Sequence, residues 1–409
     1  MRLLVVSQYF WPESFRVNDI VTELRARGHH VTVLTGLPNY PDGEVFAEFG
    51  QCPSDFSSHA GAPIVRVPVL PRGRGSLRLV LNYLSFVLSA SMLGSWRLRG
   101  LAFDTIFVFQ TSPITSALPA LLLRRLKRAP VLLWVLDLWP ETLSAVGVVR
   151  SPTVLAWVGR LVSFIYRRCD RVLVQSRAFF DNVEKYGGSR ERIRYFPNWA
   201  EPIFQGRLHD ATLASELVPY RDKFNIMFAG NIGEAQDFPA ILDAAESLRD
   251  EPQVRWLIVG DGRAAARVRS EIARRGLDAQ VVLLGRHPIE RMPEFFRGAS
   301  AMLATLRTDP VFSLTIPGKV QSYLSAGIPI LGMLDGEGAR VIEQSGAGLA
   351  CPAGQGAALA GCVRRLMAMT ADERAAMGQR GRMYCEQEFN RGRLMDALEQ
   401  WMRELSSQR

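Results

Sequence analysis

The chain alternates short apolar runs with stretches of helical spacing along most of its length. Residues 3–7 form the first apolar run, residues 17–27 repeat apolar side chains at helical spacing up to Gly28, and residues 30–35 form the next run. Parallel strands need a crossover connection, which is usually a helix, so this alternation is typical of a parallel sheet. The pattern predicts an α/β fold that begins with a strand–helix–strand unit.

The alternation runs through two similar blocks. In the first block we expect further strands at residues 64–69, 105–109, 131–136, 172–175 and 193–196. In the second we expect strands at residues 224–229, 256–259, 281–284, 301–306 and 328–331, and closing helices at residues 356–369, 371–381 and 390–406. The irregular, polar stretch between the blocks predicts a linker. The expected organisation is an N-terminal domain at residues 1–200, a linker at 201–222, a second domain at 223–385, and a C-terminal helix at 386–409 that can cross back to the first domain.

The stretch at residues 302–346 predicts an anion site. Pro317 and the glycine after it break the chain before a helical run, and a glycine-rich turn at residues 335–338 precedes a second helix start. Two helix N-termini with free backbone N–H groups then lie at one edge of the sheet, which suits a pyrophosphate. Lys319, in the first turn of the first helix, adds a positive charge. The alternative is an ordinary strand–helix–strand unit without a ligand.

Two loops and a carboxylate pair follow strands of the first block, at the edge where α/β sheets bind ligands. The loops are residues 8–13 and 36–43, and the first lacks a G-x-G-x-x-G dinucleotide fingerprint. Asp137 and Glu141 follow the strand expected at residues 131–136. The alternatives are a plain surface loop and a capping Asp beside a packed Trp.

The composition is that of a globular protein of 409 residues, with 48% hydrophobic and 22% charged residues, and the length favours two domains. The net charge of +9 favours anionic partners, such as nucleic acid, an acidic membrane surface or phosphorylated substrates. The five cysteines are scattered without a C-x-x-C pair, so we expect neither a disulfide framework nor a zinc site, and a reducing cytosol fits. The opening residues predict a buried strand rather than a signal peptide.

An apolar segment at residues 79–93 is flanked by arginines. It contains Asn82 and three serines and is shorter than the ~20 residues that cross a bilayer, so we expect no membrane span. A core helix and an interfacial helix with a basic collar are both compatible with this pattern. The flanking basic residues are Arg72, Arg74, Arg78, Arg97 and Arg99, with a further cluster at Arg124, Arg125, Lys127 and Arg128.

Ten short motifs follow one another along most of the chain. They are residues 7–13 (SQYFWPE), 28–31 (GHHV), 37–42 (LPNYPD), 137–141 (DLWPE), 196–198 (FPN), 229–233 (AGNIG), 259–262 (VGDG), 284–285 (LG), 317–329 (PGKVQSYLSAGIP) and 335–337 (DGE). Together they resemble the family 4 glycosyltransferases with the GT-B fold. The most similar subgroup comprises bacterial surface-polysaccharide enzymes of O-antigen and capsule synthesis, which include N-acetyl-L-fucosamine transferases. The resemblance implies an α/β protein with two Rossmann-like domains facing a central cleft.

The resemblance also implies a retaining enzyme that moves a sugar from a UDP-sugar to a lipid-linked or oligosaccharide acceptor. The expected sugar is an N-acetylated amino sugar such as N-acetyl-L-fucosamine. The second domain would bind this donor and the first the acceptor, without a cofactor and, since no Asp-x-Asp pair occurs, without a metal. The expected partners are a polyprenyl-diphosphate-linked acceptor and an anionic membrane surface, not nucleic acid. The enzyme would then be cytoplasmic and peripheral on the inner face of the plasma membrane.

The motifs and patterns give three groups of candidate residues. The catalytic candidates are Asp137, Glu141 and Lys319. The donor-binding candidates are Gly230, Asn231, Gly233, Gln236, Gly260, Arg286, Arg307, Pro317, Lys319, Ser322, Gly336 and Glu337. The acceptor-binding candidates are Trp11, Glu13, Arg16, Asn39, Tyr40 and Gln110.

Two departures from the family pattern affect the donor site. The family's Glu-x7-Glu pattern is missing, and Ser322 holds the place of the second Glu, which binds the ribose in relatives. Relatives place an Arg and a Lys on the pyrophosphate where this chain has Asn231 and Gln236. The expected cations are therefore Lys319 and Arg307.

Three other functions stay open as alternatives. The missing Glu pair is compatible with a non-catalytic nucleotide-sugar binding or scaffold protein. A GT-B UDP-GlcNAc epimerase would use carboxylates in an arrangement that the sequence does not show. A nucleic-acid binder is disfavoured, because the arginines are dispersed and no recognition motif occurs.

Overall fold

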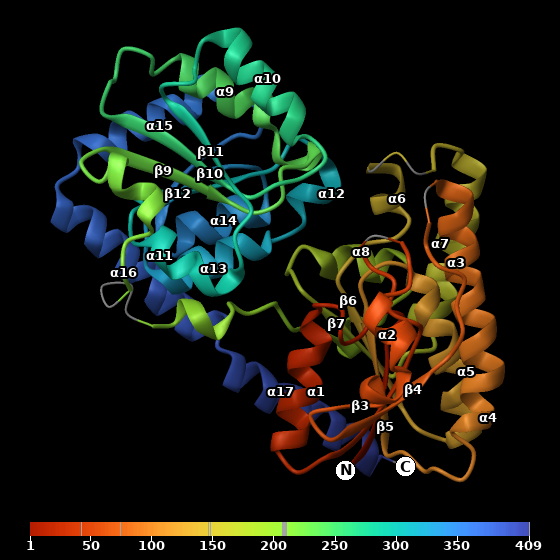
Figure 1. Ribbon diagram of the computed structural model, residues 1–409. Coiled ribbons are helices and arrows are strands. Elements are labelled where there is room, and N and C mark those ends of the chain that lie inside the picture. The colour runs from red at the N-terminus through yellow and green to blue at the C-terminus, as the bar shows by residue number, and fades with distance from the viewer. Residues whose placement is uncertain (42, 74, 146, 148, 207–210, 409) are drawn as a thin grey trace. The chain divides into compact units, whose positions relative to one another are not determined.

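The chain folds into two compact units, shown in the computed structural model of Figure 1. Unit 1 comprises residues 1–196 and 392–409, and unit 2 comprises residues 197–391. The structure describes residues 1–41, 43–73, 75–145, 147, 149–206 and 211–408. The described part of the expected linker belongs to unit 2, because Ala214 and Leu217 are buried in its core and Glu216 pairs with Arg291 at 2.8 Å.

Unit 1 is built on a sheet of eight strands in its described residues, in the order β3-β4-β2-β1-β5-β6-β7-β8. Neighbouring strands pair in parallel, except for the short antiparallel hairpin of β3 and β4. The central strand β1 pairs Val5 with Val33 of β2 and with Phe107 of β5. The strands are β1 (Arg2–Val6), β2 (His30–Thr35), β3 (Ser58–His59), β4 (Ala62–Arg66), β5 (Thr105–Gln110), β6 (Val131–Val135), β7 (Arg171–Val174) and β8 (Ile193–Tyr195).

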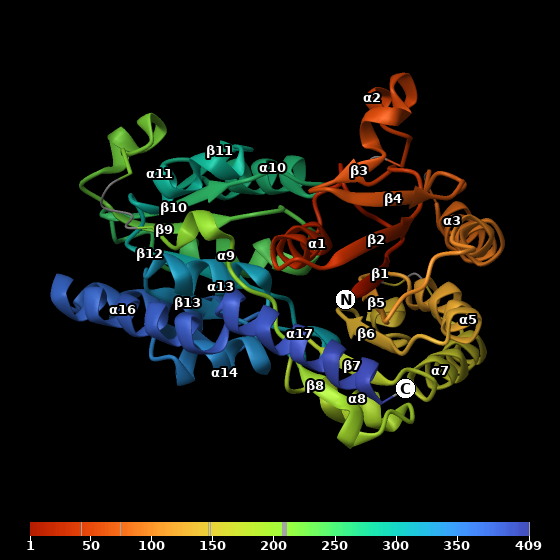
Figure 2. The same cartoon turned by 90° about the horizontal axis from the view of Figure 1, so that it is seen from below.

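Helices cover both faces of the unit 1 sheet. Figure 2 shows α3, α5 and α7 on one face and α1 and α17 on the other. The last helix, α17, is fixed to this unit by an ion pair of 2.7 Å between Arg171 and Glu404. The helices of unit 1 are α1 (Arg16–Ala26), α2 (Ala47–Gln51), α3 (Ser76–Ser89), α4 (Ser95–Arg97), α5 (Ala117–Lys127), α6 (Glu141–Ala145), α7 (Pro152–Tyr166), α8 (Phe179–Lys185) and α17 (Arg391–Ser407).

The apolar segment of unit 1 forms one continuous helix, Leu77–Arg97, in which α3 passes through a π-helical turn into α4. With 21 residues it is long and apolar enough to cross a membrane, by length and composition alone. The expectation that this segment is too short was therefore wrong. The helix extends beyond the apolar run at both ends, and it gains further large apolar side chains such as Leu77 and Trp96.

Unit 2 holds a parallel sheet of six strands in its described residues, in the order β11-β10-β9-β12-β13-β14. Successive side chains of a strand point to opposite faces, so the sheet buries two cores. Phe228 of β9 lies in the core with α9, α10 and α15, and its neighbour Met227 lies in the core with α11, α13 and α14. The strands are β9 (Phe224–Ala229), β10 (Val254–Val259), β11 (Val281–Gly285), β12 (Ala301–Thr305), β13 (Ile330–Met333) and β14 (Gly348–Cys351). The helices are α9 (Phe238–Glu246), α10 (Ala265–Arg275), α11 (Met292–Phe296), α12 (Pro310–Ser313), α13 (Gly318–Ala326), α14 (Glu337–Gln344), α15 (Gly356–Ala368) and α16 (Ala371–Glu388).

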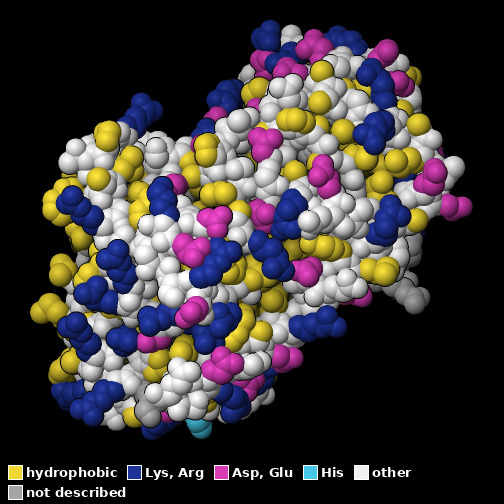
Figure 3. Space-filling view, turned by 180° about the vertical axis from the view of Figure 1, so that it is seen from behind, with side chains coloured by type: hydrophobic (Ala, Val, Ile, Leu, Met, Phe, Trp, Pro, Cys, Tyr) yellow, Lys and Arg dark blue, Asp and Glu magenta, His cyan; other side chains and the backbone are white. Residues whose placement is uncertain are grey.

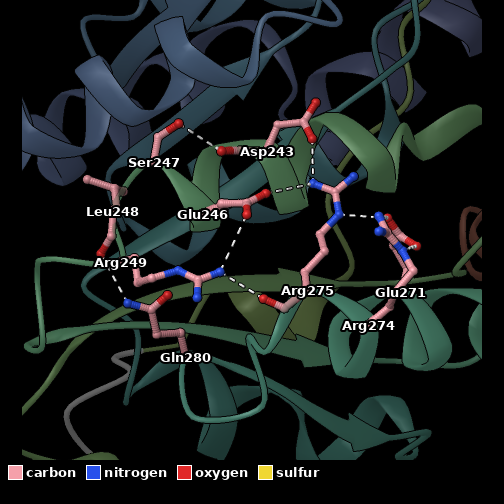
Figure 4. A network of polar contacts seen from close by, with 9 residues as sticks. All are labelled: Asp243, Glu246, Ser247, Leu248, Arg249, Glu271, Arg274, Arg275 and Gln280. Atoms are coloured by element: carbon pink, nitrogen blue, oxygen red, sulfur yellow. Dashed lines mark hydrogen bonds and ion pairs between the residues drawn. The ribbon is translucent and has the colours of Figure 1, made fainter.

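A polar network joins the last turns of α9 and α10 (Figure 4). Arg275 lies at its centre, 2.5 Å from Asp243 and 2.7 Å from Glu271. Arg249 donates to the carbonyl oxygen of Arg275 at 2.7 Å and pairs with Glu246. Because the carboxyl ends of the strands lead into the first turns of these helices, the network lies at the opposite edge of the sheet from a ligand site. Its role is to hold the two helices together.

Candidate functional site

The strand order of unit 2 creates a topological switch point between β9 and β12. The chain leaves the carboxyl ends of these two strands in opposite directions, and α/β sheets bind ligands at such a point. Two hydrogen bonds fix the loops that flank it. Oγ1 of Thr305 donates to the carbonyl oxygen of Gln236 at 2.6 Å, and the backbone N–H of Arg307 donates to that of Ala235 at 2.9 Å.

The floor of this site is bare backbone. Gly230 follows β9 and Gly260 follows β10, and a Cβ on Gly260 would lie 1.9 Å from the carbonyl oxygen of Gly230. Asn231 folds over the same turn, because its Oδ1 would lie 2.6 Å from a Cβ on Gly262, and its amide nitrogen is similarly close to Gly233. A side chain at Gly260 or Gly262 would collide with a backbone oxygen, so these two positions require glycine. The loops can therefore pack closely at the switch point, where a ligand would approach the backbone.

Lys319 points into this site from the first turn of α13. Its Nζ donates to Oε1 of Gln236 and lies 3.8 Å from the centre of the Phe228 ring. A Cβ on Gly230 would lie 3.7 Å from the same nitrogen. Burial lowers the pKa of Lys319 to about 7, because desolvation disfavours the charged amine. An anion bound here would favour the protonated form and complete the charge balance.

The remaining donor candidates are not all brought to Lys319. The guanidinium of Arg307 lies 5.6 Å from the Phe312 ring centre, and its charge acts on Asp237 beside the switch point. Arg286 is exposed at the end of the edge strand β11, which β10 separates from β9. The structure therefore supports Arg307 as a second cation near the site and leaves Arg286 apart from it.

The helices α13 and α14 begin side by side at this edge, as the sequence predicts. Pro317 is the N-cap of α13, and a Cβ on Gly338 in the first turn of α14 would lie 3.2 Å from its ring. Gly336, with φ of +66°, precedes α14 where a Cβ would lie 2.0 Å from the carbonyl oxygen of Ser313. Glu337 is buried, and Arg340 holds both of its oxygens at 2.7 and 2.8 Å.

Unit 1 has its own switch point between β1 and β5, and Glu13 organises the loops there. This carboxylate is buried and accepts backbone N–H groups of Phe10, Asn39 and Tyr40 at 3.0, 2.9 and 2.8 Å. Burial raises its pKa to about 7, although these N–H groups and Arg66 oppose the rise. Glu13 thus joins the loop after β1 to the loop after β2, and it positions Asn39 and Tyr40.

A second polar cluster joins α3 to the end of β1. Asn82 is fully buried, and its Oδ1 accepts from Nε2 of Gln8 at 2.7 Å and from the hydroxyl of Tyr9 at 3.4 Å. Its own amide donates to the carbonyl oxygen of Leu70 at 2.6 Å. Ser85, one turn later, accepts the backbone N–H of Leu70 at 2.9 Å. The polar face of this helix is therefore bonded to the sheet edge that carries the acceptor candidates.

Asp137 and Glu141 have different surroundings. Asp137 follows β6, and burial alone raises its pKa to about 7. Gln110, at the end of β5, donates to the carbonyl oxygen of Asp137 at 3.3 Å. Glu141 accepts from the hydroxyl of Tyr186 at 2.9 Å and lies 3.6 Å from Nζ of Lys185, so it is engaged within the fold. Of the pair, Asp137 is the better placed to act on a ligand.

Two acceptor candidates, Trp11 and Arg16, are engaged by other side chains of unit 1. The Trp11 ring stacks on His59 at 5.3 Å, and its carbonyl oxygen accepts from Arg66. Arg16 begins α1 and lies 3.4 Å from Asp19. In contrast, Tyr40 is partly exposed and packs against Tyr9 and Phe15 at the switch point. The position of Asp42, in the same predicted loop, lies outside the described residues.

Two family models match the chain, one in each half. The glycosyl transferase 4-like domain matches residues 14–199, and the glycosyl transferases group 1 domain matches residues 223–369. The chain belongs to the GT-B glycosyltransferases of family 4. This assignment makes the protein a transferase of sugars, with one domain model of the family matching each half of the chain.

Known relatives of this glycosyltransferase include two curated proteins. WcaI of Escherichia coli strain K12, described as a glycosyl transferase of colanic acid biosynthesis, is 28% identical over 291 residues, which are 68% of this chain and 70% of WcaI. WbjE of Pseudomonas aeruginosa, described as a glycosyltransferase, is 28% identical over 253 residues, or 59% of this chain and 62% of WbjE. The alignment thus spans less than two thirds of WbjE.

The fold of the glycosyltransferase matches that of a solved structure. Anabaena HepE, crystallised with UDP and glucose, has a TM-score of 0.68 and 16% sequence identity, over 98% of this chain and 99% of HepE. This likeness confirms the predicted GT-B class of fold, with parallel α/β sheets in two domains.

One residue of the donor side, Glu201, escaped the sequence analysis. Oγ of Ser322 donates to Oε2 of Glu201 at 2.9 Å, so a carboxylate does lie at the place where the family motif has a Glu. Ser322 is three residues after Lys319, which makes them neighbours on α13. Glu201 is 121 residues away in sequence and lies in the stretch expected to be a linker, so no local pattern could have identified it.

Proposed function

We propose that this glycosyltransferase moves a sugar from a UDP-sugar to a lipid-linked acceptor in the synthesis of a bacterial surface polysaccharide. The observation that carries the proposal is Lys319, which enters a glycine-floored switch point in unit 2. A diphosphate is bound well by helix N-termini together with a cation, and the N-termini of α13 and α14 begin at this edge of the sheet. The UDP complex of HepE and the naming of WcaI for colanic acid synthesis support the substrate classes.

In the proposed reaction the acceptor hydroxyl attacks the anomeric carbon on the side of the leaving UDP, with retention of configuration. The bond between the anomeric carbon and the diphosphate oxygen breaks, a glycosidic bond forms, and the hydroxyl proton leaves with the diphosphate. Lys319 and the N-termini of α13 and α14 stabilise charge on the departing diphosphate. Asp137 orients the acceptor hydroxyl or stabilises positive character at the anomeric carbon.

The proposed donor carries an N-acetylated amino sugar, such as N-acetyl-L-fucosamine, and the proposed transfer uses no metal. Activity that persists in EDTA would support the metal-free reaction, and restoration by added Mg²⁺ or Mn²⁺ would contradict it. Among the described residues no three His, Cys, Asp or Glu side chains form a metal-binding group.

A thermal-unfolding screen of nucleotide sugars tests the donor assignment. A ligand that binds only the folded protein stabilises it by RT ln(1 + [L]/Kd), or about 2.7 kcal/mol at a hundred times Kd. We expect protection by UDP-sugars, strongest for UDP-N-acetylhexosamines, and none by GDP-mannose. Protection by no UDP-linked compound would contradict the proposal. Binding without turnover on any acceptor would instead favour the non-catalytic alternative.

We further propose that unit 1 docks on an anionic membrane surface, at the cytoplasmic face of the plasma membrane. Only 22% of the most apolar window of the Leu77–Arg97 helix is buried. Its opposite face is bonded to the domain through Asn82 and Ser85, which favours lying on a membrane over crossing it. The exposed large side chains of this helix are Leu77, Val80, Leu81, Leu84, Leu88, Met92, Leu93 and Trp96.

The neighbouring helices continue this surface, and Figure 3 shows hydrophobic and basic side chains mixed along that side of unit 1. Three exposed aromatic rings, one on α4 and two on α7, each have an arginine over them, with the guanidinium carbon 3.8–4.8 Å from the ring centre. The pairs are Trp96 with Arg99, Trp157 with Arg160, and Phe164 with Arg168. Arginine beside aromatic rings, two of them amphipathic Trp rings, suits the level of anionic head groups. The predicted basic residue Arg74 lies outside the described residues.

Co-sedimentation with vesicles tests the docking surface. Wild type should sediment with phosphatidylglycerol vesicles at low salt and be released as salt screens the arginines. Replacing Leu88 and Trp96 by Ser should abolish sedimentation, while replacing exposed Met383 of unit 2 by Ser should not. Wild type that stays in the supernatant at low salt would contradict the proposal.

A further inference from the structure

Arg72 lies in the loop between β4 and α3 of unit 1, beside three tyrosines. Its backbone N–H donates to Oδ1 of Asn39 at 3.2 Å, and its guanidinium carbon lies 5.5 Å from the centre of the Tyr40 ring. Its charge also acts on Tyr9 and Tyr83, where it opposes the rise in pKa that burial causes. The guanidinium is therefore held at the carboxyl edge of the unit 1 sheet.

The neighbouring Arg66 shows how this unit uses an arginine for structure alone. The guanidinium of Arg66 donates to the carbonyl oxygens of Gly36 and Trp11, and its charge acts on Glu13. Arg72 differs, because within the described residues its guanidinium forms no ion pair and donates no hydrogen bond. Its charge is available to an anion.

The exposed apolar helix Leu77–Arg97 begins five residues after Arg72 in the chain. Leu70 precedes it and Leu77 follows it, and their side chains are 53% and 74% exposed. The exposed stripe then continues along the 21 residues of the Leu77–Arg97 helix, a length of about 30 Å. Arg78, in the first turn of the helix, is also exposed. A molecule with an anionic head and a long apolar chain matches this arrangement of basic residues at the start of an apolar track.

We propose that Arg72, with the hydroxyl of Tyr40, binds the diphosphate of a lipid-linked acceptor, and that the exposed stripe of α3 carries its isoprenoid chain. A guanidinium can donate two parallel hydrogen bonds to a diphosphate, and the Arg72 guanidinium is held over the Tyr40 ring, with its carbon 5.5 Å from the ring centre. This inference rests on the proposed function in one respect, that the ligand is the acceptor of the transfer. The site itself needs no donor to be tested.

Calorimetry with farnesyl diphosphate tests the site in the full chain, without donor or membrane. Arg72→Met should weaken binding by about tenfold or more, the loss expected for a charge-assisted contact. Arg72→Lys should weaken it less, since the charge remains. Arg192→Met is the matched control, because Arg192 is an exposed arginine of unit 1 that lies outside this helix, just before β8, and it should bind like wild type.

Two further probes separate the head group from the chain and this site from the donor site. Inorganic pyrophosphate and farnesol should each bind more weakly than farnesyl diphosphate.

Lys319→Ala should weaken UDP binding and leave farnesyl diphosphate binding unchanged, while Arg72→Met should do the reverse. Equal binding of farnesyl diphosphate by wild type and Arg72→Met, or an equal loss in Arg192→Met, would overturn the proposal. A failure of UDP-sugar turnover would refute the proposed function and leave this binding result standing.

Discussion

Lys319 should make the affinity for a UDP-sugar depend on pH. Burial lowers the pKa of this amine to about 7, so about half of the free protein carries the charge at pH 7. If the diphosphate binds only the charged form, the apparent Kd equals the intrinsic Kd divided by the protonated fraction. That fraction falls from about 0.9 at pH 6 to about 0.1 at pH 8, so affinity should fall about tenfold over this range.

Calorimetry with an intact UDP-sugar, without acceptor, measures this dependence. The diphosphate of a UDP-sugar keeps its charge over this range, so a rise of Kd above pH 7 reports the protein. Titrations at pH 8 in buffers of different protonation enthalpy should show uptake of about one proton, because the bound anion restores the charge of the amine. Lys319→Ala should lose the pH dependence and lower transfer about a hundredfold.

Two control variants sharpen the test. Lys319→Arg keeps a charge at every pH used, so it should bind without pH dependence. Lys223 is a partly exposed lysine of unit 2 whose Nζ donates to the carbonyl oxygen of Pro252 at 3.3 Å, and Lys223→Ala should behave as wild type. A wild-type Kd that is constant from pH 6 to 9, or a pH dependence that survives in Lys319→Ala, would refute the reasoning.

Three more predictions concern the surrounding carboxylates. Asp137→Asn should lower kcat at least about tenfold with unchanged UDP-sugar affinity, whereas an unchanged kcat would remove Asp137 from the reaction. Glu13→Gln presents an amide nitrogen to backbone N–H donors, so urea denaturation should show about 1–3 kcal/mol less stability, and an unchanged midpoint would contradict that role. Because the pKa of Glu13 in the folded protein is raised to about 7, the free energy of unfolding of wild type should fall as the pH rises from about 5 to 7. Glu13→Gln should lack this dependence on pH. Ser322→Glu would place a second carboxylate beside Glu201 and should lower both the melting temperature and UDP-sugar affinity, and adding Glu201→Gln should restore them.

Local patterns predicted the parallel sheets and the two helix starts near residues 318 and 337 well. The helix at α13 shows why: Pro317 caps its start, and Gly327, with φ of +72°, ends it in the left-handed conformation. Such signals depend on a few adjacent residues. The strands β14 and β3 were missed, because they have only four and two residues, too few for a periodic pattern.

The site was only partly predictable, because its key contacts are distant in sequence. Lys319 could be placed at a helix start, but its bond to Gln236 joins residues 83 positions apart. Glu13 was expected to touch the acceptor, and the structure shows it accepting three backbone N–H groups. Glu201 beside Ser322 depends on packing within unit 2 and has no local signature.

Transfer itself tests the central claim most directly. Purified protein would be incubated with UDP-N-acetylhexosamines and a polyprenyl-diphosphate-linked sugar, with UDP release and the mass of the lipid product measured together. The account predicts one UDP released for each sugar added to the lipid-linked acceptor, and loss of both signals in Lys319→Ala. Release of no UDP from any UDP-sugar, with wild type folded and the acceptor bound, would contradict it.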